Sequence, residues 1–306
     1  MLTKIGSLFI ALRTLFTLNR DLDLIKINQG LILSKMNLKK PHSSLSNYEF
    51  KVFSQWGEDG IIQHLIQNVF IKNKNFIEFG VEDFFESNCR FLLQKDNWDG
   101  FVIDGSSRNI KRLRNSYFYW KHSINALCSF ITRENIEELL SVSGFDKDIG
   151  LLSVDIDGVD YFVLEKLTTW TPRVLIVEFN AMFGMNRAVS VPYSSDFVRS
   201  NMHHSNLYYG ASLPAFIHLA NNMNMALVGV NSAGSNAFFV RRDLLNESVS
   251  EVSIGNCFVG AKFREGRDVN GALICQSSRE ELSSIMQLPL IDVITQATLK
   301  VGDLAC

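Results

Sequence analysis

The sequence lacks a long apolar run and closely spaced cysteines, and each absence excludes a class of protein. Near the N-terminus the longest uncharged run lies between Lys4 and Arg13, far short of the ~20 residues that span a bilayer. No small-residue cleavage site follows it, which argues against a secretory signal. The five cysteines are scattered and form no CxxC or Cys/His ligand pattern. We therefore expect no zinc site and a reducing, cytoplasmic compartment.

An excess of charge of one sign is also missing. The chain carries 30 basic and 32 acidic side chains, a net charge of −2, whereas a general nucleic-acid-binding protein carries a basic stripe. We therefore expect no nucleic-acid partner. Hydrophobic residues make up 46% of the 306 residues, which is enough for a large folded core.

The chain divides into three predicted parts: an N-terminal helical segment and linker (1–45), an α/β domain (46–245) and a C-terminal extension (246–306). Residues 1–37 are expected to form more than one helix. Near the N-terminus, apolar residues recur at helical spacing on one face, and they are Ile5, Leu8, Phe9, Leu12, Leu15 and Phe16. This face is predicted to pack on its own domain or on a second subunit in a homo-oligomer. Peripheral adsorption to a membrane surface is the alternative.

Short apolar segments alternate with helical patterns in the middle of the chain. The predicted strands are 75–81, 100–106, 151–157, 173–180, 226–231 and 236–242, with helices near 89–95, 161–170 and 212–224. Buried strands separated by helices indicate a mainly parallel sheet covered on both faces. The last two strands are joined by only "SAG", which predicts an antiparallel hairpin. This Rossmann-like α/β architecture is expected of class I S-adenosylmethionine-dependent methyltransferases.

Polar residues follow several of these strands, where an open α/β sheet binds its ligands. They are Glu78, Gly80, Glu82 and Asp83 after the first strand, Asp104 after the second, Asp155 and Asp157 in "LLSVDIDG", and Glu178 and Asn180. Gly80 allows close backbone approach to a ligand. Asp104 follows Gly80 at close to the ~20-residue spacing of a ribose-binding acid. Any one of these acids could instead cap a helix, but a binding site explains the set better.

The succession "FSQWGEDGII", "FIEFGVEDFFESNCRFLL", "WDGFVIDGS", "LLSVDIDGVDYFVLEKL", "VLIVEFN" and "YYGASL" resembles FkbM-like methyltransferases. A related bacterial group found among surface-polysaccharide genes is closer still. The resemblance covers roughly residues 48–243. It implies S-adenosylmethionine as cofactor and a sugar or surface-glycan precursor as methyl acceptor.

The resemblance also implies roles for individual residues. Glu78 and Gly80 would approach the methionine and ribose parts of the cofactor, Asp104 the ribose and Asn125 the adenine. Glu82 would also bind the cofactor, and Asp155 and Asp157 would lie between cofactor and acceptor. Gln55, Glu58 and Asp59 would close over the cofactor. One departure from the family pattern is Phe84-Phe85 after Asp83, where related sequences tend to have DG. These aromatics could narrow the pocket, stack on a base or weaken the cofactor site.

For the chemistry, Asp157 is the first choice as general base or metal ligand, with Asp155 tied more to structure or cofactor. Glu178 and Asn180 would orient the acceptor. The segment "MHHSNLYYGAS" offers His203, His204, Tyr208 and Tyr209 on a loop over the pocket. A histidine from this loop could join the three acids around a divalent cation such as magnesium, calcium or manganese.

Three other interpretations of the aspartate pair stay open. A haloacid-dehalogenase phosphatase uses a similar motif, but there it opens the catalytic domain, and the later metal motif is missing here. A nucleotide-sugar glycosyltransferase binds its metal through a DxD motif. A non-catalytic binding protein could keep the fold without turnover. Binding of S-adenosylmethionine, of a nucleotide sugar with manganese, or of neither would separate these interpretations.

Overall fold

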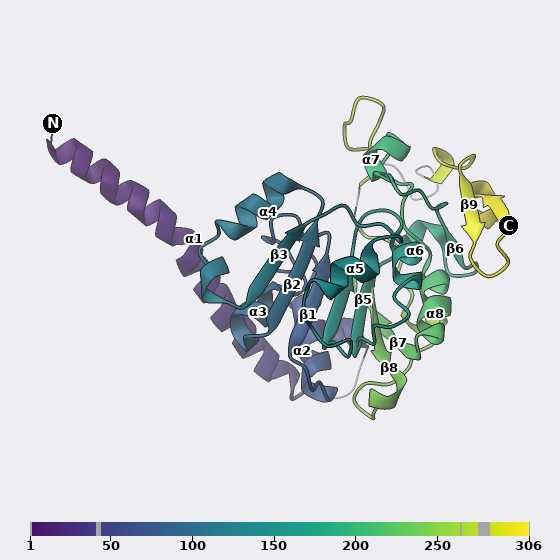
Figure 1. The fold of residues 1–306 in the computed structure, drawn as a ribbon, viewed down its shortest axis with the longest axis horizontal. Helices are drawn as coiled ribbons and strands as arrows, with labels where there is room; N and C mark the ends of the chain where they lie inside the picture. Colours follow the sequence, from purple (N-terminus) through teal and green to yellow (C-terminus); the bar gives the residue numbers. More distant parts are fainter. Residues whose placement is uncertain (1, 41–43, 264, 275–281, 306) are drawn as a thin grey trace.

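A central seven-stranded sheet forms the body of the protein in the computed structural model, which describes residues 2–40, 44–263, 265–274 and 282–305 (Figure 1). The strands lie in the order β3-β2-β1-β4-β5-β8-β7. Their bounds are β1 Asn75–Phe79, β2 Asp99–Asp104, β3 Ile124–Cys128, β4 Leu151–Val154, β5 Val174–Glu178, β7 Met225–Val230 and β8 Asn236–Arg241. β1 to β5 are parallel, and β8 runs antiparallel to both β5 and β7. The predicted class I methyltransferase fold is confirmed.

Helices cover both faces of the sheet, as the alternation of buried strand residues requires. On one face, Ile77 and Phe79 of β1 pack with α5 (Ile136–Ser141), α6 (Asp160–Glu165) and α8 (Leu213–Asn222). On the other, Phe76 packs with α2 (Glu58–Asn68), α3 (Arg90–Asp96), α4 (Ser107–Arg114) and the 3-10 helix η1 (Leu45–Tyr48). The parallel strands end at a common edge of the sheet, where α4 begins directly after β2.

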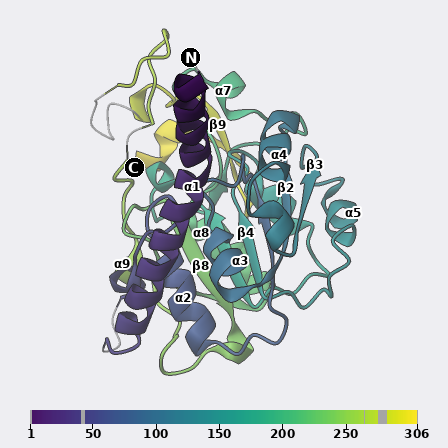
Figure 2. The ribbon, with the colours of Figure 1, turned by 90° about the vertical axis from the view of Figure 1, so that its left-hand side faces the viewer.

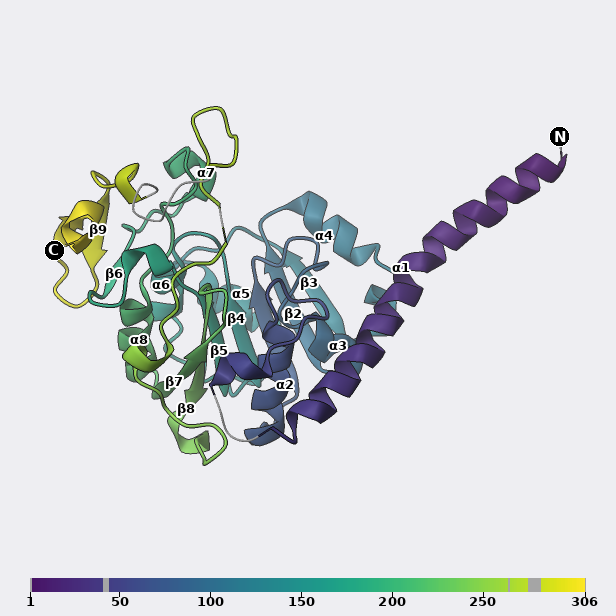
Figure 3. The same ribbon diagram turned by 180° about the vertical axis from the view of Figure 1, so that it is seen from behind.

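The N-terminal region is one helix, α1 (Leu2–Asn37), where the sequence indicated several. Its C-terminal half lies against α2 and α3, and its N-terminal half extends beyond the domain (Figures 1 and 3). The buried Asp23 forms an ion pair with Arg90 and accepts a hydrogen bond from the Tyr117 hydroxyl. The apolar side chains at positions 5, 8, 9, 12, 15 and 16, predicted to pack on protein, lie outside the described residues. Among those described, no helix is long and apolar enough to cross a bilayer.

The last 60 residues, which have little pattern in the sequence, complete a second small sheet. β9 (Pro289–Asp292) pairs with β10 (Thr298–Lys300) and with β6 (Val189–Ser190). Ile285, Leu290 and Val301 are buried in the same hydrophobic cluster as β1 and α6. Two further short helices are α7 (Arg199–Met202) and α9 (Ile254–Cys257). The C-terminal residues therefore add to the core beside α6 and α8.

Candidate active site

The loops after β1 and β4 meet at Gly80. This glycine has φ +66°, and a Cβ on it would lie 1.6 Å from the main-chain oxygen of Asp155. Only glycine combines the left-handed backbone with such a close approach. The contact brings the polar ends of two neighbouring strands to one place, as the glycine after the first predicted strand suggested.

Asp104 ends β2, and its carboxylate orientation is fixed by the main chain. One carboxylate oxygen accepts the N–H of Glu82 at 2.8 Å, and the other accepts the N–H of Ser106 at 2.7 Å. A carboxylate oxygen has more than one acceptor site, so both can still accept from a ligand. Asp104 lines a cavity of about 460 Å³, which lies within the roughly 300–1,000 Å³ of small-molecule sites.

This first cavity extends along the carboxyl ends of β1, β2, β3 and β4. Its polar lining includes Glu82, Asp104, Ser106, Asn109 and Ser129, and its apolar lining includes Ile103, Phe130, Ile131, Ile156, Val159, Phe197 and Val198. Asn125 does not line this cavity, so its contact with the adenine stays a prediction. It lies near the start of β3, because the strand runs on to Cys128 and the residues after Cys128 reach the cavity.

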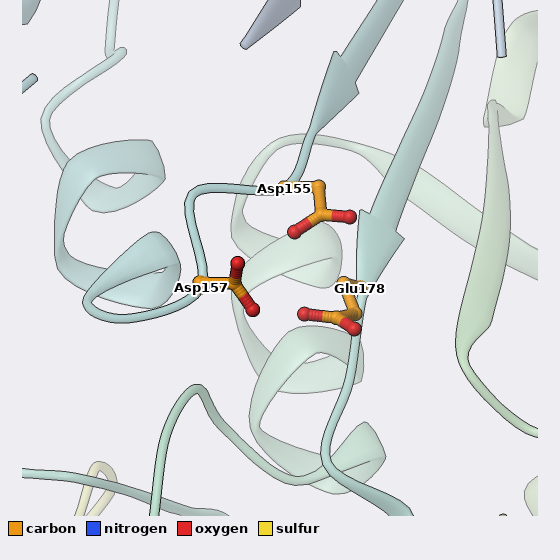
Figure 4. Close-up of side chains that lie close together, drawn as sticks. All are labelled: Asp155, Asp157 and Glu178. Carbon is orange, nitrogen blue, oxygen red and sulfur yellow. The ribbon is translucent and has the colours of Figure 1, made fainter. Parts of the chain in front are cut away.

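Three carboxyl groups converge where β4 and β5 end, and they belong to Asp155, Asp157 and Glu178 (Figure 4). One oxygen from each lies within 4.8 Å of the others. β4 stops at Val154, so both aspartates lie on the following turn, and Asp157 has φ +55°. The buried Asp160 carboxylate holds this turn by accepting the N–H groups of Ile156 and Gly158. The two aspartates therefore converge through a fixed turn rather than through strand alternation.

Burial and mutual repulsion change the acidity of this group. Burial, followed by repulsion from neighbouring carboxylates, raises the pKa of Asp155 and that of Glu178 well above their ordinary values. One oxygen of each of these two carboxyls lies within 4.8 Å of the other, so a negative charge on one disfavours a charge on the other. The pair thus holds a proton at a pH where isolated carboxyls have lost theirs.

Arg199 provides the positive charge next to the three carboxyls, and sequence reasoning missed it. Its guanidinium donates to the carboxylates of Asp157 and Glu265. It also stacks on the ring of the buried Tyr209, 3.5 Å from the centroid. No motif marks Arg199, because it starts a four-residue helix in an unpatterned segment. The ion pair occupies one carboxylate oxygen of Asp157, so that oxygen is less available to take a proton from a substrate.

A second cavity of about 470 Å³ adjoins the first one at Asp157. Phe130, Ile156, Phe197 and Val198 line both cavities. The remaining lining is polar and consists of Arg199, Ser200, Asn206, Glu265 and Arg267. Two spaces of small-molecule size therefore adjoin. They share four apolar side chains and the carboxylate of Asp157.

A third space on the other side of the three acids is strongly polar. Gln55, Glu78, Gly80 and Glu82 line it together with the acids, Arg199 and Asn236. Burial raises the pKa of Glu78 to about 7, although Ser87, Asn88 and Cys89 donate hydrogen bonds to it. Burial, and next the charge of Asp83, also raise the pKa of Glu82.

Several predicted site residues have structural roles instead. The buried Asp59 accepts the N–H groups of Val52, Phe53 and Ser54, and so fixes the turn before α2. The Glu58 carboxylate accepts from Asn231 and Asn236. Neither acid lines a cavity described above, because main-chain and amide donors near α2 occupy both carboxylates.

The two residues expected to act on the acceptor beside Glu178 also lie elsewhere. The buried Asn180 amide donates to the main-chain oxygens of Leu207 and Tyr209 and so anchors that loop. His204 is exposed and contacts His203, with 4.2 Å between ring centroids and the ring planes tilted by 39°. The loop presents other groups to the cavity, with Asn206 in the lining.

The aromatic pair at 84–85 does not narrow the first cavity. Phe84 is fully buried and stacks on Phe76, with 6.4 Å between ring centroids. Phe85 is exposed and lies 5.4 Å from the Arg90 guanidinium. Neither ring lines that cavity, so the departure from the family pattern changes the core.

Comparisons with known proteins match the fold alone. No family model and no curated protein matches the chain. Among solved structures, it is similar to the CurJ carbon methyltransferase (7% identity, TM-score 0.39, 60% of this chain and 52% of that one). It is also similar to an O-methyltransferase family protein from Burkholderia thailandensis (10% identity, TM-score 0.35, 55% of this chain and 50% of that one). A third similar structure is a SAM-dependent methyltransferase from Aquifex aeolicus (9% identity, TM-score 0.36, 61% of this chain and 90% of that one).

The chain spans about half the length of the first two of these structures. With TM-scores below 0.5, the similarities do not bear on substrate or activity. The fold assignment stands on the strand order, and the FkbM-like resemblance stays a hypothesis.

Proposed function

We propose that the protein is an S-adenosylmethionine-dependent O-methyltransferase that acts on a sugar or surface-glycan precursor. The observation that carries the proposal is the pair of adjoining cavities, with Asp104 in one and Asp157 in both, and with Asp155 and Glu178 next to Asp157 in the adjoining polar space. This arrangement follows the rule that ligands bind at the carboxyl edge of an open α/β sheet.

The residues of the first cavity suit the cofactor. Asp104 would accept the ribose hydroxyls, because its carboxylate is already oriented by two main-chain donors. The apolar lining from Phe130 to Val159 offers a slot for a flat base. Gly80 lets the main chains after β1 and β4 meet at the wall of this cavity. When bound, S-adenosylmethionine supplies an electrophilic methyl group.

The second cavity suits a polyhydroxylated acceptor. It combines hydrogen-bonding side chains with two phenylalanine rings. Methyl transfer to a hydroxyl requires removal of the hydroxyl proton, and a base with a raised pKa does this best near neutral pH. We therefore assign the proton acceptor to the Asp155–Glu178 pair, in place of Asp157. Asp157, paired with Arg199, would position the acceptor.

The three carboxyls also suit a divalent cation, which is the observation that favours the metal-dependent glycosyltransferase alternative. A cation there would compete with Arg199 for Asp157. The strand order favours methyl transfer over this alternative. A requirement for metal would appear as loss of activity with EDTA and recovery with magnesium or manganese.

Calorimetry with S-adenosylhomocysteine, the demethylated product, tests cofactor binding. Asp104→Ala should weaken binding by roughly 10- to 150-fold, which corresponds to the ~1.5–3 kcal/mol of a lost charge-assisted hydrogen bond. Asp99→Ala is the matched control, because Asp99 is exposed at the opposite end of the same strand. Binding of a nucleotide sugar with manganese, without binding of S-adenosylhomocysteine, would replace the proposal with the glycosyltransferase.

A labelling experiment tests the acceptor class. Cell extract would be incubated with the protein and tritium-labelled S-adenosylmethionine, and the labelled product identified by mass spectrometry. We expect the label as a methyl ether on a glycan or nucleotide-sugar fraction. Label on protein or nucleic acid would contradict the assignment to a sugar.

A further inference from the structure

Helix α1 packs one face on its own domain and carries a second, apolar face that the domain does not cover. The domain face contains the buried residues Asp23, Gly30, Ser34 and Asn37. The Ser34 hydroxyl bonds to side chains of α2, and the Asn37 amide donates to the main-chain oxygen of Tyr48. These contacts fix which side of α1 faces outwards. Figure 2 shows that side toward the viewer, with α2 and α3 behind it.

The outward side carries a stripe of large apolar side chains that are 45–62% exposed: Leu18, Leu22, Ile25, Ile32 and Met36. At 3.6 residues per turn, the mean direction of the stripe is roughly 130° from that of the domain face. A helix packed on the stripe would therefore lie away from the domain. Such a row of exposed apolar side chains marks an interaction surface.

The spacing of the stripe identifies a helix as its partner. The stripe has one gap, between Ile25 and Ile32, and Gln29 fills it. With Gln29 included, successive residues are alternately four and three positions apart, as the d and a positions of a heptad repeat are. In the sequence the same spacing continues back through Leu15, Ala11 and Leu8. A repeat sustained over about four heptads is typical of a coiled coil. Gln29 occupies an a position, where one polar residue fixes register and oligomeric state.

The charges beside the stripe select a second copy of the same chain. Asp21 is at a g position and Lys26 at the e position five residues further on, and both are exposed. In a parallel, in-register coiled coil, g of one helix meets this e of the other. Asp21 of each copy would then pair with Lys26 of the other. In the single chain Asp21 pairs with its neighbour Arg20, an exposed contact that contributes little.

We propose that α1 pairs with α1 of a second copy in a parallel, two-stranded coiled coil, which makes the protein a homodimer. The two α/β domains lie on opposite outer sides of the coil, each held to its own α1 by the Asp23–Arg90 pair. Gln29 faces Gln29 within the apolar seam and excludes shifted registers. The carboxyl edges of both sheets stay clear of the dimer contact.

Sedimentation equilibrium on the full chain tests the oligomeric state. We expect a mass twice that of the 34.7 kDa chain. The double variant Ile25→Glu/Ile32→Glu should sediment as a monomer with an unchanged circular dichroism signal from the domain. The matched control is Leu24→Glu, because Leu24 is 54% exposed beside Ile25 but points away from the stripe. It should leave the dimer intact. A monomeric wild-type chain, or a dimer that survives the double variant, would overturn the proposal.

Two further variants test the geometry of the pairing. Asp21→Lys should weaken the dimer at least threefold, and adding Lys26→Asp should restore it, because the exchanged charges again meet across the coil. Ile25→Cys should form a disulfide cross-link between copies under mild oxidation that the wild-type chain does not form. Failure to cross-link would rule out the parallel register. A different outcome is a monomeric wild-type chain that co-sediments with phosphatidylserine vesicles. If Ile25→Glu/Ile32→Glu abolishes that co-sedimentation, the stripe binds lipid instead of a second copy.

Discussion

The carboxyls of Asp155 and Glu178 lie next to each other at the ends of β4 and β5, with one oxygen of each within 4.8 Å of the other. Desolvation and mutual repulsion raise the pKa of both, so the pair keeps a proton to higher pH than isolated carboxyls do. When ionised, a carboxyl with a raised pKa is a stronger proton acceptor than an ordinary carboxylate. The first two predictions follow from this property.

Glu178→Gln should reduce methyl transfer by roughly 10²- to 10⁴-fold, the usual loss when a general base is removed. The amide keeps the shape of the side chain and can still hydrogen-bond Asp155, but it cannot accept a proton. The measurement is kcat with the acceptor found by labelling, with S-adenosylhomocysteine affinity as the control. Full activity in a folded variant would remove Glu178 from the mechanism.

Asp157→Asn should shift the pH profile to lower pH and keep substantial activity. The charge of Asp157 is one cause of the raised pKa values of Asp155 and Glu178. Without that charge both pKa values fall, so the base becomes deprotonated at lower pH. The test is kcat against pH from 5 to 9. Loss of activity at every pH, with the cofactor still bound, would instead restore Asp157 as the base.

The free energy of unfolding should fall less steeply with rising pH in the Glu78→Gln variant than in the wild type. The folded pKa of Glu78 is about 7 against an ordinary 4.5, so the folded state binds the proton more tightly than the unfolded one. Protonated Glu78 therefore adds about 3 kcal/mol to the free energy of unfolding below about pH 4.5. This contribution is lost as the pH rises through about 7.

Urea unfolding of the wild type and of Glu78→Gln at pH 5 and pH 7.5 measures this effect. The wild type should lose more free energy of unfolding between the two pH values than the variant does. Equal losses would mean that Glu78 titrates as it does in the unfolded chain.

Gly80→Ala should destabilise the protein and abolish cofactor binding. Its Cβ would collide with the main-chain oxygen of Asp155, and alanine does not favour φ +66°. Gly105→Ala is the control, because a Cβ there comes no closer than 3.6 Å to its nearest neighbour, Phe130. Melting temperatures compare the two. A Gly80→Ala protein that melts like the control would show that the loop after β1 adjusts freely.

The parallel sheet and its ligand-binding edge follow from the sequence because they depend on local patterns. Apolar runs such as "NFIEF" specify fully buried strands, and the short "SAG" connection forces a hairpin. The acids that directly follow strands, from Glu78 to Glu178, reach the edge because the backbone places them there. Gly80 and Asp104 were predicted at the edge on the same basis.

The remaining site residues depend on contacts that no local pattern encodes. Arg199 and Glu265 are 66 residues apart and meet only through tertiary packing. Asp59 and Asn180 follow the same residue pattern as a site, but main-chain groups bind Oδ2 of Asp59 and the side-chain amide of Asn180. Sequence spacing cannot show which polar groups the fold has already satisfied.

The contact between Gly80 and the main chain of Asp155 has a mechanical consequence. It leaves no free space between the loop beside the cofactor cavity and the turn that holds Asp155 and Asp157. A ligand that displaces the loop at Gly80 must therefore also displace the turn at Asp155. Binding in one cavity then moves part of the wall of the other. The two substrates should accordingly bind in a preferred order. The substrate that binds first sets the position of the Asp157 carboxyl, which the second substrate then contacts.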